Sequence, residues 1–431
     1  MKNIKINIKE LGAVRNSIIQ IKPMMIFSGE SGLGKSYVAI LVHFFYKLLA
    51  EKRLQGFFDT REWDFETLIK SNPDKGGFSF SASKLLDWIN EDAKAYMRQS
   101  VGNPELPVSV SFDIPFEHSE YTFSYRIAKF GIEGKEQLNY TFELDNTIMR
   151  VGAETKNIGN QPWCMLLEDA LRKELLDEDV IKQTFAMVPG RGALLNIPIT
   201  MQDRVKENGD IYTEFLSDWN VVRSMPYRKH DDDDLLGLLY NINGGKIELD
   251  ETDNIVYRID DAKHIPISAA ASSIKELAPL YMLLDKYPCK QLSILFEEPE
   301  AHLHPHKQVD IADFVVRTVN KGSHMQITTH SDYFLRRLND RIFLYKIMER
   351  DNTLYEKTIR KYNYTDLTLD PSSIGAFLLR RQKDGSVNVI PQVLDKGIPY
   401  ESFYNVIKNE TRYSLDIQQT YYNIIGSTHV E

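Results

Sequence analysis

The stretch "SGESGLGKS" at residues 28–36 follows the apolar run "MMIFS" (residues 24–28) and leads into the apolar segment "SYVAILVHFFYKLLAEKRL". Residues 29–36 match GxxxxGK[ST], and their place between a predicted strand and a predicted helix is the context that a phosphate-binding loop requires. Glycines let the backbone turn with its N–H groups toward a phosphate, and the positive end of the following helix adds to the attraction. We therefore expect Lys35 to reach the β- and γ-phosphates and Ser36 to bind Mg²⁺. The expected nucleotide-binding residues of this loop are Gly29, Glu30, Ser31, Gly32, Leu33, Gly34, Lys35 and Ser36.

A second apolar strand ends in two carboxylates, in "LSILFEEPEAHLHPH" at residues 292–306. Hydrolysis of a phosphoanhydride needs one carboxylate in the Mg²⁺ shell and another that orients the attacking water. Glu297 fits the first role and Glu298 the second. The alternative is a strand that ends in solvated acids, which the following "PEAHLHP" makes a poor fit.

A third buried strand is predicted in "ITTHSDYF" at residues 327–334, and it places His330 at a sheet edge. There an imidazole could contact a γ-phosphate, so His330 is a candidate catalytic residue. The competing interpretation is a structural histidine, which is the commoner case for a single His after a strand.

The remaining sequence predicts a mixture of helices and strands. Residues 4–9 and 17–29 read as two strands, and residues 107–151 alternate with period two, which predicts an antiparallel sheet or meander. Helical spacing is found around residues 83–99, 166–183 and 274–287, and the sequence from 341 onward predicts short strands and a final helix near 400–410.

Composition limits the classes of function. The net charge of −9 argues against a surface that is basic throughout, so contact with nucleic acid would need a local basic patch. The two cysteines, Cys164 and Cys289, form no CxxC pair, which indicates a reducing compartment. No run approaches ~18 apolar residues, so we expect a cytoplasmic protein that does not span a membrane.

The phosphate-binding loop, "FEEPEAHLHP" and "TTHSDYF" together resemble the ABC-type ATPases of the RecF/SMC and OLD (overcoming lysogenization defect) group. The resemblance covers residues 1 to about 50 and about 240 to 340. It implies an α/β fold, a P-loop NTPase of ABC-ATPase head type with an antiparallel β lobe and helical insertions. The expected head spans residues 1–340, with the β-rich segment at about 107–151, a helical insertion at about 160–240 and the signature lobe at about 241–340. Residues 341–431 are expected to form an extension that packs on the head or binds a partner.

The resemblance also implies a head-to-tail homodimer, or a higher homo-oligomer, with ATP held between one subunit's P-loop and the other subunit's signature segment. We match that segment to "SAAASSIKELAPL" (residues 268–280), where Ser272 and Ser273 would face the partner's γ-phosphate. An ordinary capping box, with Ser273 as N-cap and Glu276 three residues later, is the alternative. Arg191, in "VPGRGALL", is a candidate near the nucleotide, and a structural salt bridge is an equally good interpretation. His302, His304 and His306 invite a metal site, but the resemblance places them on a structural loop.

The expected function is ATP hydrolysis with Mg²⁺. No heptad-repeat arm and no C-terminal Toprim constellation is found, so we expect no nuclease activity from this chain. Similar ATPases without a nuclease serve in anti-phage systems such as Septu, PARIS and some retrons, which implies a sensor or scaffold subunit that controls a separate effector, for example a nuclease. One alternative is a RecF-like DNA-binding ATPase in repair or recombination, with basic strips in "RKELL", "RLNDR" or "LLRRQK". Another is a scaffold that binds ATP and barely hydrolyses it.

Overall fold

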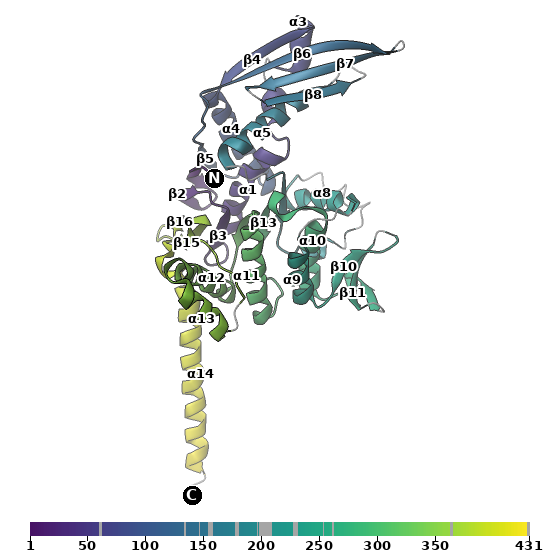
Figure 1. Cartoon of the computed structure of the whole chain (residues 1–431). Helices are drawn as coiled ribbons and strands as arrows, with labels where there is room; N and C mark the ends of the chain where they lie inside the picture. The colour runs from purple at the N-terminus through teal and green to yellow at the C-terminus, as the bar shows by residue number, and fades with distance from the viewer. Residues whose placement is uncertain are drawn as a thin grey trace.

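The computed structural model describes residues 1–59, 63–132, 135–145, 147–153, 158–176, 181–195, 197, 209–226, 232–252, 254–260, 263–362 and 365–428 (Figure 1). Its body is built on a nine-stranded mixed sheet of order β5-β1-β2-β16-β15-β3-β14-β13-β9. The α/β fold expected from the sequence, with an antiparallel lobe and additional helices, is confirmed. The strands of this sheet are β1 (Lys5–Leu11), β2 (Val14–Gln20), β3 (Met24–Ser28), β5 (Val108–Asp113), β9 (Gln183–Met187), β13 (Leu292–Glu297), β14 (His324–Thr328), β15 (Ile374–Arg381) and β16 (Val387–Pro391).

The centre of this sheet is parallel and fully covered. β3, β14, β13 and β9 are neighbours in parallel register, and every residue of β3, β13 and β14 is buried. Strands buried on both faces are mostly apolar, which explains the runs "MMIFS" and "LSILFE", although β14 also buries His324 and Gln326. Because the strands are parallel, their carboxyl ends meet at one edge of the sheet. The segments after β3, β13 and β14 therefore converge there.

Helices cover the sheet and extend the body. α1 (Lys35–Ala50) is buried along most of its length and packs on β3, β9, β13 and β14. α11 (Pro305–Asn320) packs on β14 and on α12 (Asp332–Arg350). The other helices are α2 (Gln55–Asp59), α3 (Phe65–Ser71), α4 (Ala82–Ser100), α5 (Gln161–Leu176), α6 (Arg191–Leu194), α8 (Ile211–Ser224), α9 (Asp233–Asn243), α10 (Ser272–Lys286), α13 (Asn352–Tyr362) and α14 (Glu401–Thr428).

A separate antiparallel lobe stands at the upper end of the molecule in Figure 1. It is a four-stranded sheet of order β4-β6-β7-β8, and α5 packs on β7 and β8. Its strands are β4 (Lys75–Ser81), β6 (Glu120–Ile132), β7 (Lys135–Leu144) and β8 (Thr147–Ala153). A third, three-stranded sheet holds β10 (Lys246–Leu249), β11 (Ile255–Asp260) and β12 (Lys263–Pro266).

Several sequence-based expectations need correction. Residues 17–29 form two strands, because Ile21–Pro23 separates β2 from β3 and Pro23 has no N–H for a ladder. The meander expected over 107–151 holds only for β6, β7 and β8. β5 leaves it and pairs with β1, where Asp113 lies opposite Lys5. Parts of the helical insertion expected at 160–240 lie outside the described residues, at 177–180, 196, 198–208 and 227–231.

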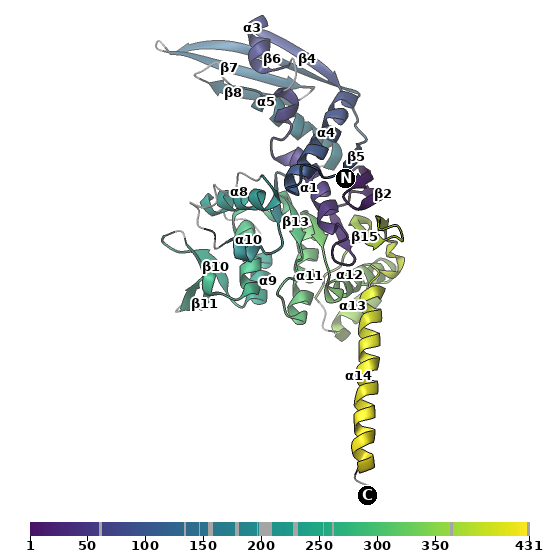
Figure 2. The same ribbon diagram turned by 180° about the vertical axis from the view of Figure 1, so that it is seen from behind.

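The C-terminal quarter of the chain is built into the head. The boundary expected between 340 and 341 falls within α12, and β15 and β16 lie between β3 and β2 in the central sheet. α14, by contrast, projects away from the body in both Figure 1 and Figure 2. Among the described residues, no helix combines the length and the apolar character needed to cross a bilayer.

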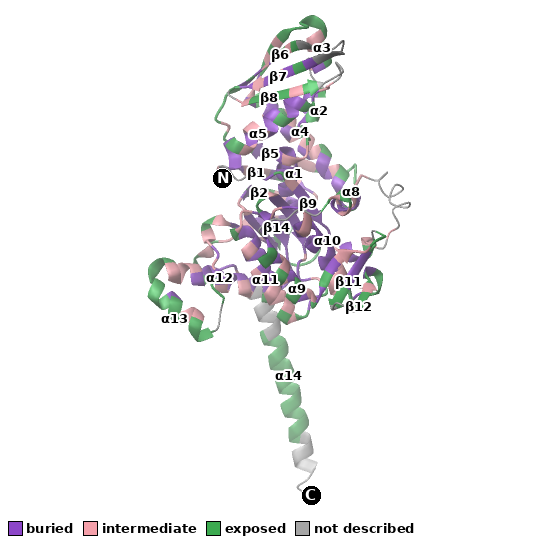
Figure 3. Ribbon diagram, turned by 45° about the vertical axis from the view of Figure 1, so that its right-hand side comes forward, coloured by how far each residue is buried: buried purple, intermediate pink, exposed green. Residues whose placement is uncertain are grey.

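The core of the antiparallel lobe is aromatic, and Trp163 is at its centre. The indole is fully buried, and it meets the Phe142 ring edge to face at 4.8 Å and the Phe123 ring at 5.4 Å. The purple interior of this lobe is visible in Figure 3. α5 is thereby fixed to the sheet.

We expect Trp163→Ala to lower the free energy of unfolding by about 3–5 kcal/mol, because it removes a large buried side chain and leaves a cavity. Urea denaturation followed by circular dichroism measures this loss. Ile148→Ala, at a side chain on the same lobe that is 55% exposed, is the matched control and should cost less than about 1 kcal/mol. Equal losses for the two variants would contradict the packing described here.

Candidate functional site

The loop from Gly29 to Gly34 joins β3 to α1 at the carboxyl edge of the parallel strands. Gly29, Gly32 and Gly34 have φ values of +131°, +74° and +91°, which L side chains rarely adopt. A Cβ on Gly29 would lie 2.6 Å from the Leu379 carbonyl oxygen, so only glycine fits there. Gly34 is the N-cap of α1 and offers no side-chain cap, which leaves the first N–H groups of the helix available to an anion.

Lys35 is the first residue of α1, and its side chain turns back to the Gly29–Gly34 loop. Its Nζ donates to the carbonyl oxygens of Gly29 at 3.1 Å and of Glu30 at 2.8 Å, and the residue is 6% exposed. Burial lowers the pKa of Lys35 to about 8, and the nearby carboxylates of Glu298, Glu300 and Glu297 oppose that shift. A phosphate bound beside Lys35 would supply negative charge that stabilises the buried ammonium group.

Glu297 is the last residue of β13 and is 2% exposed. Burial raises the pKa of its carboxyl group to about 7, and a hydrogen bond donated by the Ser36 hydroxyl acts in the opposite direction. Within the described part of the chain, Glu297 Oε2 is buried with no hydrogen-bond partner. A hydroxyl and a carboxylate with a free oxygen are hard oxygen ligands of the kind that Mg²⁺ prefers. Ser36 and Glu297 therefore fit two ligands of a Mg²⁺ ion whose other ligands would be phosphate and water oxygens.

Glu298 follows in a strained conformation, with φ of +45°. Its N–H donates to the Thr328 carbonyl at 3.0 Å, so the residue after β13 is tied to the end of β14. This backbone turn directs Glu298 to the cavity that Lys35 and His330 also line. Strain of this kind persists where the surroundings fix it, and it is concentrated at functional sites.

His330 follows β14 and lies beside the same cavity. Its N–H donates to Glu300 Oε1 at 2.6 Å, and the Thr329 hydroxyl donates to the same oxygen at 2.8 Å. Burial and the neighbouring Lys35 lower the pKa of His330, while Glu298 opposes them. Glu300, in the segment between β13 and α11, thus holds the histidine segment in place.

The cavity has a volume of about 520 Å³ and extends beyond the expected motif residues. At Gly12, the Tyr37 ring passes so close that an added Cβ would lie 3.1 Å from it. Three lining residues belong to no motif: Gly12 is in the β1–β2 turn, Tyr37 is near the start of α1, and Leu106 is in the loop after α4. Pairing of β1 with β5 brings the β1–β2 turn beside the loop after α4, where the Gly12 N–H donates to the Pro107 carbonyl oxygen. The lining residues are Gly12, Ala13, Ser31, Gly32, Gly34, Lys35, Ser36, Tyr37, Leu106, Glu298, Thr328 and His330.

Arg191 is placed behind this cavity. Its guanidinium is fully buried, it donates to the carbonyl oxygens of Glu276 at 2.8 Å and of Glu297 at 2.9 Å, and it lies 3.6 Å from the Glu276 carboxylate. Burial lowers the pKa of Arg191, and Glu276 opposes this shift most strongly. These contacts match the structural salt-bridge interpretation of Arg191, and they tie α10 to the end of β13.

Ser272 and Ser273 begin α10 and do not line the cavity. The alternative interpretation of this segment, a capping box with Ser273 as N-cap, is wrong, because Ala271 is the N-cap and no side chain caps the helix. Glu276 has turned instead to Arg191 and to the Gly192 N–H, at 3.2 Å. The first turn of α10 therefore offers its N–H groups and serine hydroxyls on the surface.

The three histidines of "HLHPH" form no metal site. His304 Nδ1 accepts from the His306 N–H at the start of α11, and His306 lies beside Asp310. Across the described ranges, no cluster of three or more His, Cys, Asp or Glu residues could hold a metal ion.

Comparison with known proteins gives a partial match. A sequence model of the AAA ATPase domain family matches residues 166–335, a span that contains Glu297, Glu298 and His330 and excludes the loop at 29–36. No curated protein matches the chain. An SMC head bound to the C-winged helix domain of ScpA is 13% identical, with a TM-score of 0.37 over 91% of this chain and 98% of that one. The SMC head domain from Thermotoga maritima is 12% identical, with a TM-score of 0.34 over 91% and 100%. The Smc head from Pyrococcus furiosus, bound to the C-terminal domain of ScpA, is 12% identical, with a TM-score of 0.38 over 96% and 100%. Residues 166–335 are thus similar to AAA ATPase domains.

The raised pKa of Glu297 generates a pH-dependent prediction. Between the usual pKa of 4.5 and about 7, the folded protein holds this proton and the unfolded chain does not, so the stabilisation is present at low pH and is lost as the pH rises through 7. Without Mg²⁺ or nucleotide, Glu297→Gln should therefore raise the free energy of unfolding by about 1–3 kcal/mol at about pH 8 and by less at about pH 5.

Urea titrations at the two pH values measure the effect of Glu297→Gln. Glu30→Gln removes an exposed carboxylate from the same loop and should change stability by less than about 0.5 kcal/mol. A destabilising effect of Glu297→Gln at pH 8 would show that this carboxylate is not strained by burial.

Proposed function

We propose that this chain binds ATP with Mg²⁺ and hydrolyses it. One observation carries the proposal: the P-loop, Glu298 and His330, separated by about 260–300 residues in sequence, line one cavity, and Glu297 lies against Ser36 of the P-loop. A phosphate site, a magnesium site, a water-orienting carboxylate and an imidazole are the components of phosphoryl transfer to water. The match of residues 166–335 to AAA ATPase domains supports this class.

Each side chain has a defined task in this proposal. The N–H groups at the start of α1 and Lys35 bind the β- and γ-phosphates, and Lys35 leaves its two carbonyl acceptors to do so. Ser36 and Glu297 hold the Mg²⁺, which would neutralise charge on the phosphate oxygens. Glu298 orients the attacking water and accepts its proton. His330, with its lowered pKa, is neutral at pH 7 and can donate one hydrogen bond to the γ-phosphate.

The proposal extends to a head-to-tail dimer around ATP. The first turn of α10 lies away from the chain's own cavity, so Ser272 and Ser273 could contribute only to a partner's nucleotide. By analogy with the family resembled, the dimer would act as sensor and scaffold in an anti-phage system and control a separate effector such as a nuclease. Its net charge of −9 suits a protein partner better than bare DNA.

Two substitutions test the proposed chemistry. Lys35→Ala should abolish ATP binding, whereas Lys357→Ala on the exposed face of α13 should not change it. Glu298→Gln should still bind ATP but lower kcat about 100- to 10,000-fold and accumulate closed dimers. Isothermal titration and phosphate release measure both. Normal ATP binding by Lys35→Ala would refute the phosphate site, and equally negligible turnover of wild type and Glu298→Gln would favour a non-hydrolysing scaffold.

A row of basic side chains favours a second candidate function, a RecF-like ATPase that binds DNA. On the outer face of the antiparallel lobe, Lys75 lies opposite Arg126, which lies opposite Thr141, which lies opposite Arg150. All three basic residues are exposed and line a cavity of about 570 Å³. Like charges directly opposite each other destabilise a sheet, so an anionic partner would relieve them. The strip expected in "RLNDR" is less suitable, because Arg337 and Arg341 pair with Asp313.

If this second function holds, binding to duplex DNA will be salt-dependent through these side chains. Arg126→Gln/Arg150→Gln should reduce the slope of log K against log salt by about 2, since each phosphate contact contributes about 0.9. Fluorescence anisotropy over a salt series measures the slope. The control is Lys357→Gln/Lys361→Gln on α13, which removes the same charge. An unchanged slope in the lobe variant would exclude this surface.

A further inference from the structure

The cavity of the candidate site has one end that the proposed hydrolysis does not use. Gly12, Ala13, Tyr37 and Leu106 line this end. They come from the turn between β1 and β2, from the start of α1 and from the loop between α4 and β5. We call these four residues the apolar end of the cavity.

The order of the strands separates the apolar end from Glu298 and His330. β15 is parallel to β3, β16 is antiparallel to β15, and β2 is parallel to β16. The turn before β2 therefore lies at the same edge of the sheet as the P-loop. In the sheet, β2 is on one side of β3, whereas β14 and β13 are on the other. The P-loop thus lies between the apolar end and the two residues that follow β13 and β14.

The apolar end presents an aromatic ring and an aliphatic side chain. A Cβ on Gly12 would lie 3.1 Å from the Tyr37 ring and 3.7 Å from the Leu106 side chain, so both side chains approach the turn closely. Leu106 is 4% exposed, and Tyr37 is half-buried. A surface of this kind suits a flat aromatic group, which can stack on the ring.

Backbone polar groups of the apolar end are hydrogen-bonded within the chain. The Gly12 N–H donates to the Pro107 carbonyl oxygen at 3.1 Å, and the Leu106 N–H donates to the Asn103 carbonyl oxygen at 3.1 Å. The carbonyl oxygens of Gly12, Ala13 and Leu106 accept hydrogen bonds from other parts of the chain. Adenine and guanine differ in the donors and acceptors at their edges, whereas both have an aromatic face. The apolar end is therefore suited to the face of a purine and not to its edge.

We propose that the apolar end holds the nucleotide base, and that the site accepts purine nucleoside triphosphates without discriminating between adenine and guanine. This inference rests on the proposed nucleotide site, in which Lys35 and the start of α1 hold the triphosphate. With the γ-phosphate toward Glu298 and His330, the base points to the other end of the cavity. The volume of about 520 Å³ is within the range of sites that hold a whole small-molecule ligand. Apolar contact discriminates weakly between ligands, whereas a site that hydrogen-bonds a group rejects a ligand without it.

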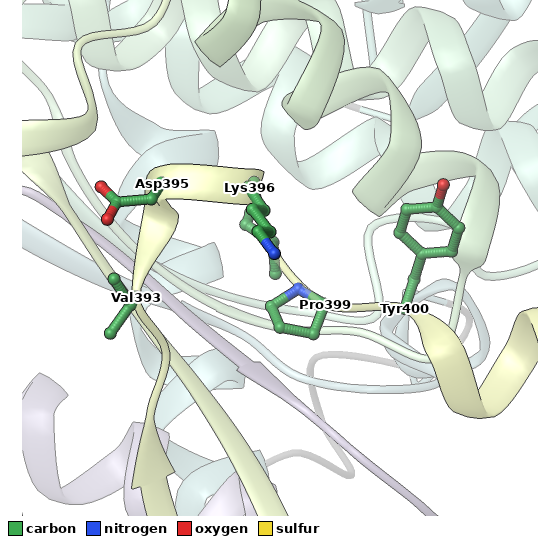
Figure 4. A pocket seen from close by; sticks show the side chains of 7 residues that line it. Val393, Asp395, Lys396, Pro399 and Tyr400 are labelled. Atoms are coloured by element: carbon green, nitrogen blue, oxygen red, sulfur yellow. The ribbon is translucent and has the colours of Figure 1, made fainter.

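A second cavity supplies a matched control. It has a volume of about 550 Å³ and is lined by Val393 and Asp395–Tyr400, in the segment after β16 (Figure 4). Because β16 is antiparallel to β15, this segment leaves the sheet at the edge opposite the P-loop. Tyr400 is half-buried like Tyr37, so Tyr400→Ala removes an equivalent ring from the other edge of the sheet.

The first experiment compares three ligands, each with Mg²⁺, by isothermal titration of the full chain carrying Glu298→Gln, in which turnover is slow. ATP and GTP should bind with dissociation constants within about tenfold of each other, and a larger preference for either would overturn the proposal. Inorganic tripolyphosphate, which has no base, should bind about 5- to 150-fold more weakly than ATP, the range for loss of one stacked base.

The tripolyphosphate titration distinguishes failure of the base site from failure of the phosphate site. Binding of tripolyphosphate as tight as that of ATP would overturn the base site and leave the proposed phosphate site intact. If neither ligand binds, the proposed nucleotide site is refuted, and the base site is refuted with it.

The second experiment repeats these titrations with substitutions at the apolar end. Tyr37→Ala should weaken ATP and GTP binding alike, by about 5- to 150-fold, and leave tripolyphosphate binding unchanged, because the ring contacts only the base. Leu106→Ala should show the same selectivity. Tyr37→Phe keeps the ring and should bind all three ligands as before, as should Tyr400→Ala. Equal losses of ATP and tripolyphosphate binding in both alanine variants at the apolar end, or a loss in Tyr37→Phe, would overturn the proposal.

Discussion

The contact between Ser36 and Glu297 depends on the order of three parallel strands. β3, β14 and β13 are adjacent, so the P-loop, His330 and the glutamate pair leave the sheet at the same edge. No single segment forms the site. A shift of one residue in the register of β13 would turn Glu297 away from the edge and replace it by a neighbour, because side chains alternate between the faces of a strand. Burial of these strands on both faces holds this register, and in β13 and β14 the buried Ser293 and Gln326 side chains also pair with each other.

The candidate site contains several buried charged side chains, and Arg191 stabilises this arrangement from the interior of the protein. Glu297, Glu298 and Glu300 lie within electrostatic reach of Lys35, and Arg191 contacts the backbone of Glu297 from the interior. Arg191 also bonds α10, the helix whose first turn is proposed to serve the partner's nucleotide. A movement of α10 on dimerisation would therefore be transmitted to Glu297 through the Arg191 guanidinium. Burial raises the pKa of Glu297, and a divalent cation bound beside it would favour the charged carboxylate.

The candidate site residues could be predicted because they lie in local sequence motifs. The elements that are placed by non-local strand pairing could not be predicted. "SGESGLGKS", "FEEPE" and "TTHS" each carry a strand and a turn within about ten residues, so their elements could be predicted. The register of β5 could not, because β5 alternates as regularly as β6–β8 and only β1 determines its place. The position of β15 and β16 depends on partners more than 340 residues away. Glu276 resembled a capping residue, and its actual contact with Arg191 has no signature in the sequence.

The insertion of β15 between β3 and β16 has a consequence for biosynthesis. β3 is completed by residue 28, yet it pairs on one side with β15 at Ile374–Arg381, and the Leu379 carbonyl lies against Gly29. A ribosome must therefore translate past residue 381 before β3, the strand that leads into the Gly29–Gly34 loop, has both of its neighbours. Until then the N-terminal strands present unpaired edges, which are prone to aggregation. We therefore expect the nascent chain to need a chaperone. The order of synthesis thus delays completion of the central sheet around the Gly29–Gly34 loop until β15 has emerged.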